Sequence, residues 1–210
     1  MKLVQPDIDR YLARWAASDD PVIGAMEQLA AERGFPIVGP QVGRLLLTLA
    51  RSINAKRVLE LGSGFGYSAW WFATAVGPEG HVILTEGSQE NADLARGFIE
   101  RAGLEGRVEI RVGDGLKIAD EYDGPFDIVF NDIDKQDYPR ALPVALERLR
   151  PGGLFITDNM LWQGLVLEES NPDASTRGVQ ELTRALYAHP SLDTTILPIR
   201  DGVSVSTVRR

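Results

Sequence analysis

The chain has 210 residues, 44% of them hydrophobic and 25% charged, which is an ordinary balance for a globular domain with a full core. The absence of cysteine excludes disulfides, thiolate nucleophiles and cysteine-bound zinc, and no apolar run reaches the roughly 18 residues that a membrane span needs. The net charge of −8 argues against a broad nucleic-acid surface. From the length, the composition and the absence of cysteine, we expect a cytoplasmic protein that forms one domain over residues 1–210.

The first part of the chain, residues 1–56, predicts a helical cap. Apolar residues recur there at helical spacing over three stretches, which are 8–17, 22–33 and 41–53. We expect these three helices to cover one side of a sheet and to roof the edge at which a ligand binds.

From residue 57 onward, short apolar runs alternate with longer mixed segments. The runs that predict strands are 57–61, 81–86, 107–112, 126–132, 153–158, 194–197 and 203–208. The segments that predict helices are 67–76, 91–102, 138–149 and 175–188, with glycine-containing loops at 77–80, 103–106 and 151–153. This alternation is typical of βαβ units. We therefore expect an α/β fold with a Rossmann-like core over 57–210 and a mostly parallel seven-stranded sheet, whose last two strands form an antiparallel hairpin at Asp201-Gly202.

A glycine-rich turn follows the first expected strand. Its residues are Glu60-Leu61-Gly62-Ser63-Gly64-Phe65-Gly66-Tyr67-Ser68, and an apolar, helix-compatible segment comes next. Strand, glycine turn and helix together bring a backbone and a helix N-terminus close to a nucleotide-like ligand. The dinucleotide fingerprint Gly-x-Gly-x-x-Gly needs its third glycine where Tyr67 stands, so the departure favours S-adenosylmethionine over NAD. Taken alone, the motif is also compatible with a plain tight turn.

The first five expected strands all end in polar or glycine residues, at the sheet edge where open α/β folds bind ligands. These ends are Glu60, Glu86, Gly113-Asp114-Gly115, Asn131-Asp132-Ile133-Asp134-Lys135 and Asp158-Asn159. Glu86 lies 24 positions after Gly62 (86 − 62), near the distance at which an acidic residue accepts hydrogen bonds from ribose hydroxyls in NAD enzymes and S-adenosylmethionine enzymes alike. Asp114 has two interpretations of equal weight, an acceptor for an adenine amino group or the cap of a short helix.

Asp132, Asp158 and Asn159 predict a cation site. Two carboxylates and an amide carbonyl are hard oxygen donors that suit Mg²⁺, and the ends of successive strands can converge. The alternative is a pair of solvated carboxylates at strand ends. Trp162, just after Asn159, is placed to line a pocket for a planar substrate.

Lys135 is the candidate general base. It follows Asp132 by three residues, close enough to sense a cation bound there. A neighbouring positive charge disfavours a protonated lysine, and a lysine that gives up its proton can act as a base near neutral pH. The alternative is an exposed lysine that pairs with Asp134 or Asp137.

Several motifs in a fixed order carry a resemblance to a known family. Beside the loop at 60–68, they are Asp132-Ile133-Asp134-Lys135-Gln136-Asp137-Tyr138, Asp158-Asn159-Met160-Leu161-Trp162-Gln163-Gly164 and Pro198-Ile199-Arg200-Asp201-Gly202. From about residue 36 onward the chain resembles the cation-dependent O-methyltransferases of the caffeoyl-CoA and catechol type, including their small bacterial relatives. It departs from them at Val42, where a glutamate is usual, and at Thr183, where many carry an asparagine.

The resemblance implies a cofactor, a cation and a homodimer. S-adenosylmethionine would be bound by Val38, Glu60, Gly62, Ser68, Glu86, Asp114, Gly115 and Asp132. The divalent cation, expected to be Mg²⁺, would be bound by Asp132, Asp158 and Asn159. Lys135 and Asp132 would be the catalytic residues, with Lys135 close to the acceptor hydroxyl.

We therefore expect a metal-assisted methyl transfer to a hydroxyl of a catechol-like or phenolic small molecule. A phenol with a pKa of about 10 is mostly protonated at neutral pH, and chelation by a cation would lower that pKa. One alternative is a tRNA hydroxyuridine O-methyltransferase of the same fold, which the acidic balance disfavours. Another is an NAD-dependent oxidoreductase, which Tyr67 and the lack of a hydride-transfer acid disfavour.

Overall fold

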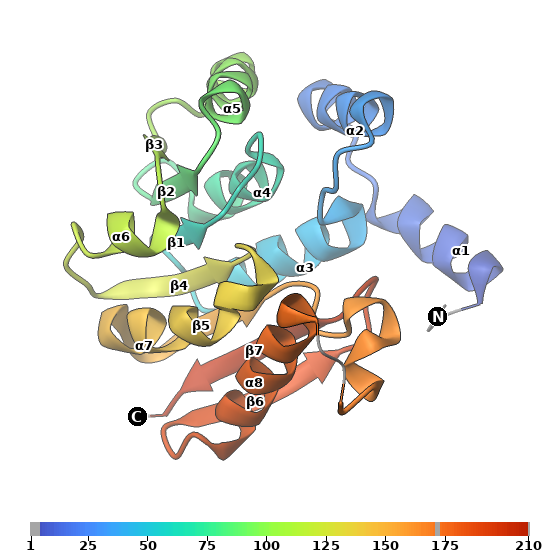
Figure 1. Ribbon diagram of the computed structural model, residues 1–210. Coiled ribbons are helices and arrows are strands. Elements are labelled where there is room, and N and C mark those ends of the chain that lie inside the picture. Colours follow the sequence, from blue (N-terminus) through green and yellow to red (C-terminus); the bar gives the residue numbers. More distant parts are fainter. Residues whose placement is uncertain (1–4, 171–172, 210) are drawn as a thin grey trace.

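The computed structural model describes residues 5–170 and 173–209, and a single sheet runs through its centre (Figure 1). The strands are β1 (Arg57–Leu61), β2 (His81–Glu86), β3 (Val108–Val112), β4 (Phe126–Asn131), β5 (Leu149–Thr157), β6 (Leu192–Leu197) and β7 (Val203–Val208). In this part of the chain they form a seven-stranded sheet in the order β3-β2-β1-β4-β5-β7-β6. Strands β1 to β5 run parallel, and β7 is antiparallel to both β5 and β6. The expected mostly parallel sheet with a C-terminal hairpin is confirmed.

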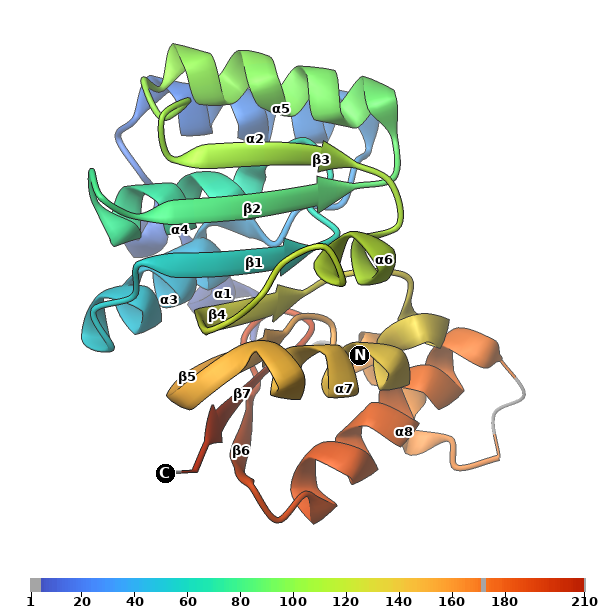
Figure 2. The same cartoon turned by 90° about the vertical axis from the view of Figure 1, so that its left-hand side faces the viewer.

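Helices lie on both faces of this sheet, as Figure 2 shows. They are α1 (Pro6–Ala16), α2 (Pro21–Arg33), α3 (Gly39–Ser52), α4 (Tyr67–Val76), α5 (Gln89–Arg101), α6 (Gly115–Ala119), α7 (Tyr138–Arg148) and α8 (Ala174–Ala188). Two short 3₁₀ segments, η1 (Lys135–Asp137) and η2 (Trp162–Leu167), follow β4 and β5. None of the described helices is long and apolar enough to cross a membrane.

The strands read as nearly continuous apolar runs because both of their faces are buried. Successive strand residues point to opposite faces. Val58 of β1 packs in a core with α3, α4 and α5, while the next residue, Leu59, packs in a second core with α7 and α8. Trp70 and Trp71 of α4 belong to the first core, so neither is available as a substrate contact or as a surface for a partner.

The three cap helices form, but α1 does not cover the sheet. Its apolar side chains Ile8, Tyr11, Leu12 and Trp15 are exposed, and Figure 1 shows the helix projecting beyond α3. Gln41 of α3 donates to the Asp9 backbone oxygen (3.1 Å), and Arg44 donates to the Ala17 backbone oxygen (2.8 Å). The expectation of three roofing helices is therefore wrong for α1, because these hydrogen bonds hold its polar side to α3 and leave its apolar side outward.

Strand β5 begins earlier than expected, because the segment 151–153, predicted as a loop, lies inside it. Residues 150–153 face Asp127 alone on β4, which makes this segment a β-bulge. Gly152 has a φ of 76°, a left-handed value that glycine adopts without strain. Arg150 Nε donates to the Asp127 carboxylate (2.6 Å) and closes the bulge against β4.

Candidate active site

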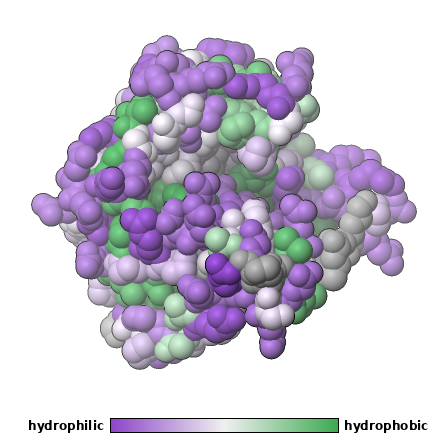
Figure 3. Space-filling view, viewed as in Figure 1, coloured by the Kyte–Doolittle hydropathy of each residue, from purple (hydrophilic) through white to green (hydrophobic). Residues whose placement is uncertain are grey.

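A cavity of about 890 Å³ opens at the carboxyl edge of the sheet. Figure 1 looks onto this edge, and Figure 3 shows the same face hollowed between largely hydrophilic rims. Most lining residues come from the loops that follow β1 to β5 and from the loop between α2 and α3, and the β6–β7 turn adds Asp201. The predicted site residues among them are Val38, Gly62, Ser68, Glu86, Asp114, Gly115, Asp132, Lys135, Asp158 and Asn159. Trp162 also lines the cavity, as expected.

The glycine loop between β1 and α4 lies tightly against its neighbours. Gly62 has a φ of 76°, and a Cβ added there would lie 2.7 Å from the Asp132 backbone oxygen. The backbone N–H of Gly64 donates to Glu86 Oε2 (2.8 Å). Glycine is thus required for the close approach to the end of β4, and the expected strand–turn–helix geometry is present.

Glu60 is the predicted cofactor residue that the structure places elsewhere. Its side chain is 0% exposed and, among the described residues, lies behind the lining of the cavity. The Glu60 carboxyl accepts hydrogen bonds from the hydroxyls of Ser63 (2.8 Å) and Ser68, and burial raises the pKa of Glu60 to about 8. Direct cofactor contact by Glu60 stays a prediction, since this residue lies inside β1 and its carboxyl faces the serines of the glycine loop rather than the open cavity. It holds the two serines that do line the cavity.

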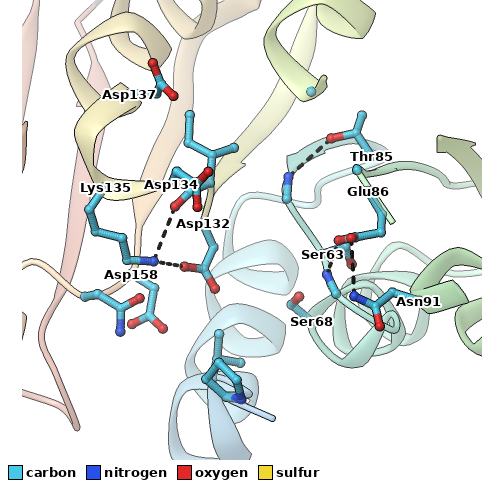
Figure 4. A pocket seen from close by; sticks show the side chains of 18 of the residues that line it. Ser63, Ser68, Thr85, Glu86, Asn91, Asp132, Asp134, Lys135, Asp137 and Asp158 are labelled. Carbon is cyan, nitrogen blue, oxygen red and sulfur yellow. Dashed lines mark hydrogen bonds and ion pairs between the residues drawn. The ribbon is translucent and has the colours of Figure 1, made fainter. Parts of the chain in front are cut away.

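Glu86 ends β2 and faces the glycine loop, as Figure 4 shows. Beside its bond to Gly64, Glu86 Oε1 accepts from the Ser88 backbone N–H (2.8 Å) and from Asn91 Nδ2 (3.3 Å). Asn91 also lines the cavity and was missed from the sequence. The sequence signal that could have identified Asn91 is its position in the first turn of the helix that follows β2, close to the ligand edge of the sheet.

Asp114 caps the short helix α6 and lines the cavity as well. Its Oδ1 accepts from the Leu116 backbone N–H (3.0 Å), which confirms the helix-cap interpretation. Contact with an adenine amino group stays a prediction. Helix α6 occupies five residues after a strand, too short a segment for apolar periodicity to reveal.

Lys135 and Asp132 form an ion pair inside the cavity (Figure 4). Lys135 Nζ lies 2.8 Å from Asp132 Oδ1, and the two side chains are 15% and 27% exposed. The alternative of an exposed lysine paired with Asp134 or Asp137 is therefore wrong. Asp137 pairs with Arg140 instead (2.8 Å).

Asp158 is a buried carboxylate without a complete set of partners. Its side chain is 4% exposed, and none of the described groups hydrogen-bonds its Oδ1. Burial and the neighbouring Asp132 carboxylate raise the pKa of Asp158 to about 7, and burial also raises the pKa of Asp132 although Lys135 opposes this. The Tyr138 hydroxyl, which closes the motif at 132–138 and is also buried, donates to the Asp158 backbone oxygen (2.9 Å). Two neighbouring carboxylates such as Asp132 and Asp158 repel each other, and either a shared proton or a bound cation would relieve this repulsion.

The chemistry of this donor set fits a divalent cation only if Asn159 takes part. In the described part of the chain, no three histidine, cysteine, aspartate or glutamate side chains gather closely enough to hold a metal ion. Asp132 and Asp158 therefore need a third, uncharged oxygen, and Asn159 lines the same cavity. Asn159 Nδ2 donates to Asp201 Oδ2 (3.4 Å), which leaves the amide oxygen as the atom free to bind a cation.

The two departures from the family pattern lie away from the cavity that the described residues form. Val42 is fully buried in the core beneath α3, and the Thr183 hydroxyl of α8 donates to the Val179 backbone oxygen (2.9 Å). An apolar residue at position 42 suits a core site. Both positions can thus differ from the relatives without changing the walls of the cavity.

Comparisons with known proteins agree with this geometry. The family model described as O-methyltransferase matches residues 17–210. A catechol O-methyltransferase of Niastella koreensis is 34% identical over 96% of this chain and 96% of its own length. Caffeoyl-CoA O-methyltransferase 2 of Populus trichocarpa is 33% identical over 78% of this chain and 71% of its own length.

A solved structure gives the same result. The O-methyltransferase TomG of Streptomyces achromogenes, involved in tomaymycin synthesis and solved in complex with SAM, has a TM-score of 0.90. It is 31% identical over 97% of this chain and 96% of its own. The chain therefore belongs to the O-methyltransferase family of the catechol and caffeoyl-CoA type, and the expectation of an S-adenosylmethionine-dependent O-methyltransferase rather than an NAD-dependent oxidoreductase is confirmed.

Proposed function

We propose that this enzyme transfers the methyl group of S-adenosylmethionine to a hydroxyl of a catechol-like or phenolic small molecule, assisted by a divalent cation, most simply Mg²⁺. The observation that carries the proposal is the buried Asp158 carboxylate beside Asp132 and Asn159, one oxygen of which accepts no hydrogen bond from the described residues. Removal of two carboxylates from water is costly unless a positive charge compensates them.

The donor would occupy the end of the cavity beside the glycine loop. Glu86 would accept hydrogen bonds from the ribose hydroxyls, and Asp114 with Gly115 would face the adenine. Gly62 and Ser68 would lie along the methionine part, with Val38 on the other side. All of these groups line one continuous cavity.

The cation would be held by Asp132, Asp158 and Asn159. Lys135 would act as the general base for the acceptor hydroxyl. A bound cation would lower the pKa of a chelated phenol and fix the direction of its attack. Lys135 now donates to Asp132 (2.8 Å) and to the Ile133 backbone oxygen (3.3 Å). With a cation on Asp132 this ion pair would weaken, and Lys135, once its own proton had passed to solvent, would take the proton from the acceptor hydroxyl. The oxygen then forms a bond to the methyl carbon, whose bond to sulfur breaks, and the sulfonium becomes a thioether.

The charge of the cavity supports a small acceptor over tRNA or a coenzyme A ester. The carboxylates of the lining are Glu86, Asp114, Asp132, Asp134, Asp137, Asp158 and Asp201. The cations are Lys135 and Arg140. A polyphosphate would meet a mainly negative wall, whereas a neutral phenol would not. The similarity to a catechol O-methyltransferase over nearly the whole of both chains points the same way.

An acceptor screen tests the proposal. Catechol, a flavonoid with vicinal hydroxyls, caffeoyl-CoA and undermodified tRNA would each be incubated with S-adenosylmethionine, with and without Mg²⁺, and methylated product measured. We expect methylation of the free catechols, dependent on Mg²⁺. Methylation of tRNA, falling steeply with salt, alongside inert catechols would establish the RNA alternative instead. The homodimer and the cytoplasmic location stay predictions.

A further inference from the structure

The loop between β5 and η2 is held in a conformation that its residues do not prefer. Asn159, Trp162 and Gln163 have φ values of 55°, 44° and 55°, all in the left-handed region. Asparagine tolerates this region, but a bulky residue such as tryptophan rarely adopts it. Such backbone persists only where surrounding contacts over-determine it, and it concentrates at ligand sites.

Asp201, in the turn between β6 and β7, supplies the contacts that hold this loop. Asp201 Oδ1 accepts from the Gln163 backbone N–H (2.6 Å), and Asp201 Oδ2 accepts from Asn159 Nδ2 (3.4 Å). The Asp201 backbone oxygen also accepts from the Leu161 N–H (2.8 Å). One residue therefore bonds the loop at its start, its middle and its end.

The carboxylate of Asp201 also decides which way the Asn159 amide faces. An ionised carboxylate only accepts hydrogen bonds, so Asn159 must turn its NH₂ toward Asp201 and its oxygen away. An amide NH₂ cannot bind a cation, whereas the amide oxygen can. The orientation is decisive because, among the described residues, no third acidic or histidine side chain completes a metal site with Asp132 and Asp158.

The same loop places the wall of the acceptor site. The centre of the Trp162 ring lies 5.8 Å from Lys135 Nζ, and both side chains line the cavity. The bond from Gln163 to Asp201 fixes the backbone just after this ring. Displacement of the loop would therefore move the third cation ligand and the aromatic wall together.

We propose that Asp201 is a positioning residue: by bonding Asn159 and Gln163 at once, it aims the Asn159 amide oxygen at the cation and sets Trp162 beside Lys135. This inference rests on the proposed metal-assisted function. Asp201 itself would touch neither the cation nor the acceptor hydroxyl.

The substitution Asp201→Asn separates orientation from mere support of the loop. An asparagine at 201 can still accept from the Gln163 backbone N–H, which cannot turn. Its NH₂ would then face the NH₂ of Asn159, so Asn159 would rotate its oxygen toward residue 201 and its NH₂ toward the cation. In the double variant, Asp201→Asn is combined with Asn159→Asp. The amide NH₂ at position 201 then donates to one carboxylate oxygen at position 159, and the other oxygen of that carboxylate remains for the cation. Asp193→Asn, an exposed carboxylate of the same hairpin, is the matched control.

The readouts are Mn²⁺ affinity by electron paramagnetic resonance, S-adenosylmethionine affinity by calorimetry and the melting temperature without metal. We expect Asp201→Asn to weaken Mn²⁺ binding by roughly 10–100-fold, the scale for partners that orient a metal ligand, with donor affinity and melting temperature close to wild type. The double variant should recover most of the Mn²⁺ affinity, and Asp193→Asn should match wild type.

Unchanged Mn²⁺ affinity in Asp201→Asn would overturn the positioning role, and so would a double variant that binds no better than Asp201→Asn. The melting temperature could also fall by the same amount in Asp201→Asn as in Asp201→Ala. Asp201 would then only support the loop structurally, and the positioning role would again be overturned. A wild-type protein that binds no Mn²⁺ would instead refute the metal-assisted function, a result distinct from these three.

Discussion

At the glycine-loop end of the cavity, Glu60 and Glu86 each accept several hydrogen bonds from the protein, whereas at the opposite end Asp132 and Asp158 have fewer partners than a buried carboxylate needs. Glu60 accepts from two serine hydroxyls, and Glu86 accepts from two backbone N–H groups and Asn91. Asp132 has Lys135 as its partner, and one oxygen of Asp158 lacks a hydrogen bond from any described group.

The difference shows which end of the cavity is complete without a ligand. The glycine-loop end is organised by its own hydrogen bonds, so a donor molecule adds contacts to a site already in place. The opposite end keeps a buried carboxylate, Asp158, beside the partly buried Asp132 and a strained loop, an arrangement that a cation would stabilise. Each prediction below changes one end and measures both.

Removal of the cation ligands should have the largest effect. Asp158→Ala with Asn159→Ala should reduce methyl transfer to background, because the remaining Asp132 cannot hold a cation, while S-adenosylmethionine affinity by calorimetry stays near that of wild type. EDTA should mimic the double variant and added Mg²⁺ should reverse it, since a site of few protein ligands and several waters exchanges its ion readily. Full turnover in EDTA would favour a purely general-base mechanism.

Lys135→Ala should lower turnover by roughly 10²–10⁴-fold, as expected for loss of a general base, with near-normal affinity for donor and cation. Lys117→Ala is the matched control, because Lys117 also follows an aspartate by three residues but is exposed and lies outside the cavity lining. Steady-state kinetics on a catechol over a range of pH would measure both. Turnover within a few-fold of wild type would show that cation binding alone activates the hydroxyl.

Glu86→Ala should weaken S-adenosylmethionine binding by roughly 1–3 kcal/mol, the scale of lost hydrogen bonds to a charged group. Part of the loss would arise because the Gly64 N–H loses Glu86 as its acceptor, so that the glycine loop is held less firmly. Mn²⁺ affinity should not change, because the opposite end is untouched. Glu90→Ala, an exposed carboxylate of α5, is the control, and equal donor affinity in the two variants would place the ribose elsewhere.

The pattern of strand ends was enough to predict most of the site, because parallel strands bring their carboxyl ends to one edge. Asp132 and Asp158 lie 26 residues apart in the sequence (158 − 132), yet both line one cavity. Glu60 differs from these residues for a physical reason. It stands one residue before the end of β1, and its buried carboxyl bonds Ser63 and Ser68 instead of lining the cavity.

Contacts between distant segments could not be predicted in this way. The motif that contains Asp201 was recognised, but its bond to Asn159 depends on how the β6–β7 turn packs against the β5 edge. The outward apolar side of α1 is a similar case, because periodicity indicates a helix but not the surface that its apolar side contacts.

The smallest effect should come from Glu60, because its titration changes stability with pH at the glycine-loop end of the cavity alone. The pKa of Glu60 is about 8 in the folded protein against an ordinary 4.5, so between these values the folded state keeps a proton that the unfolded state releases. Stability should therefore fall as pH rises from 5 to 8. Glu60→Gln mimics the neutral carboxyl and cannot titrate, so its melting temperature should fall less, by a few degrees, since about 1 kcal/mol corresponds to roughly 2–4 °C. Parallel melting curves across this pH range would mean that Glu60 is ionised in the folded protein and that both ends of the cavity hold charged carboxylates.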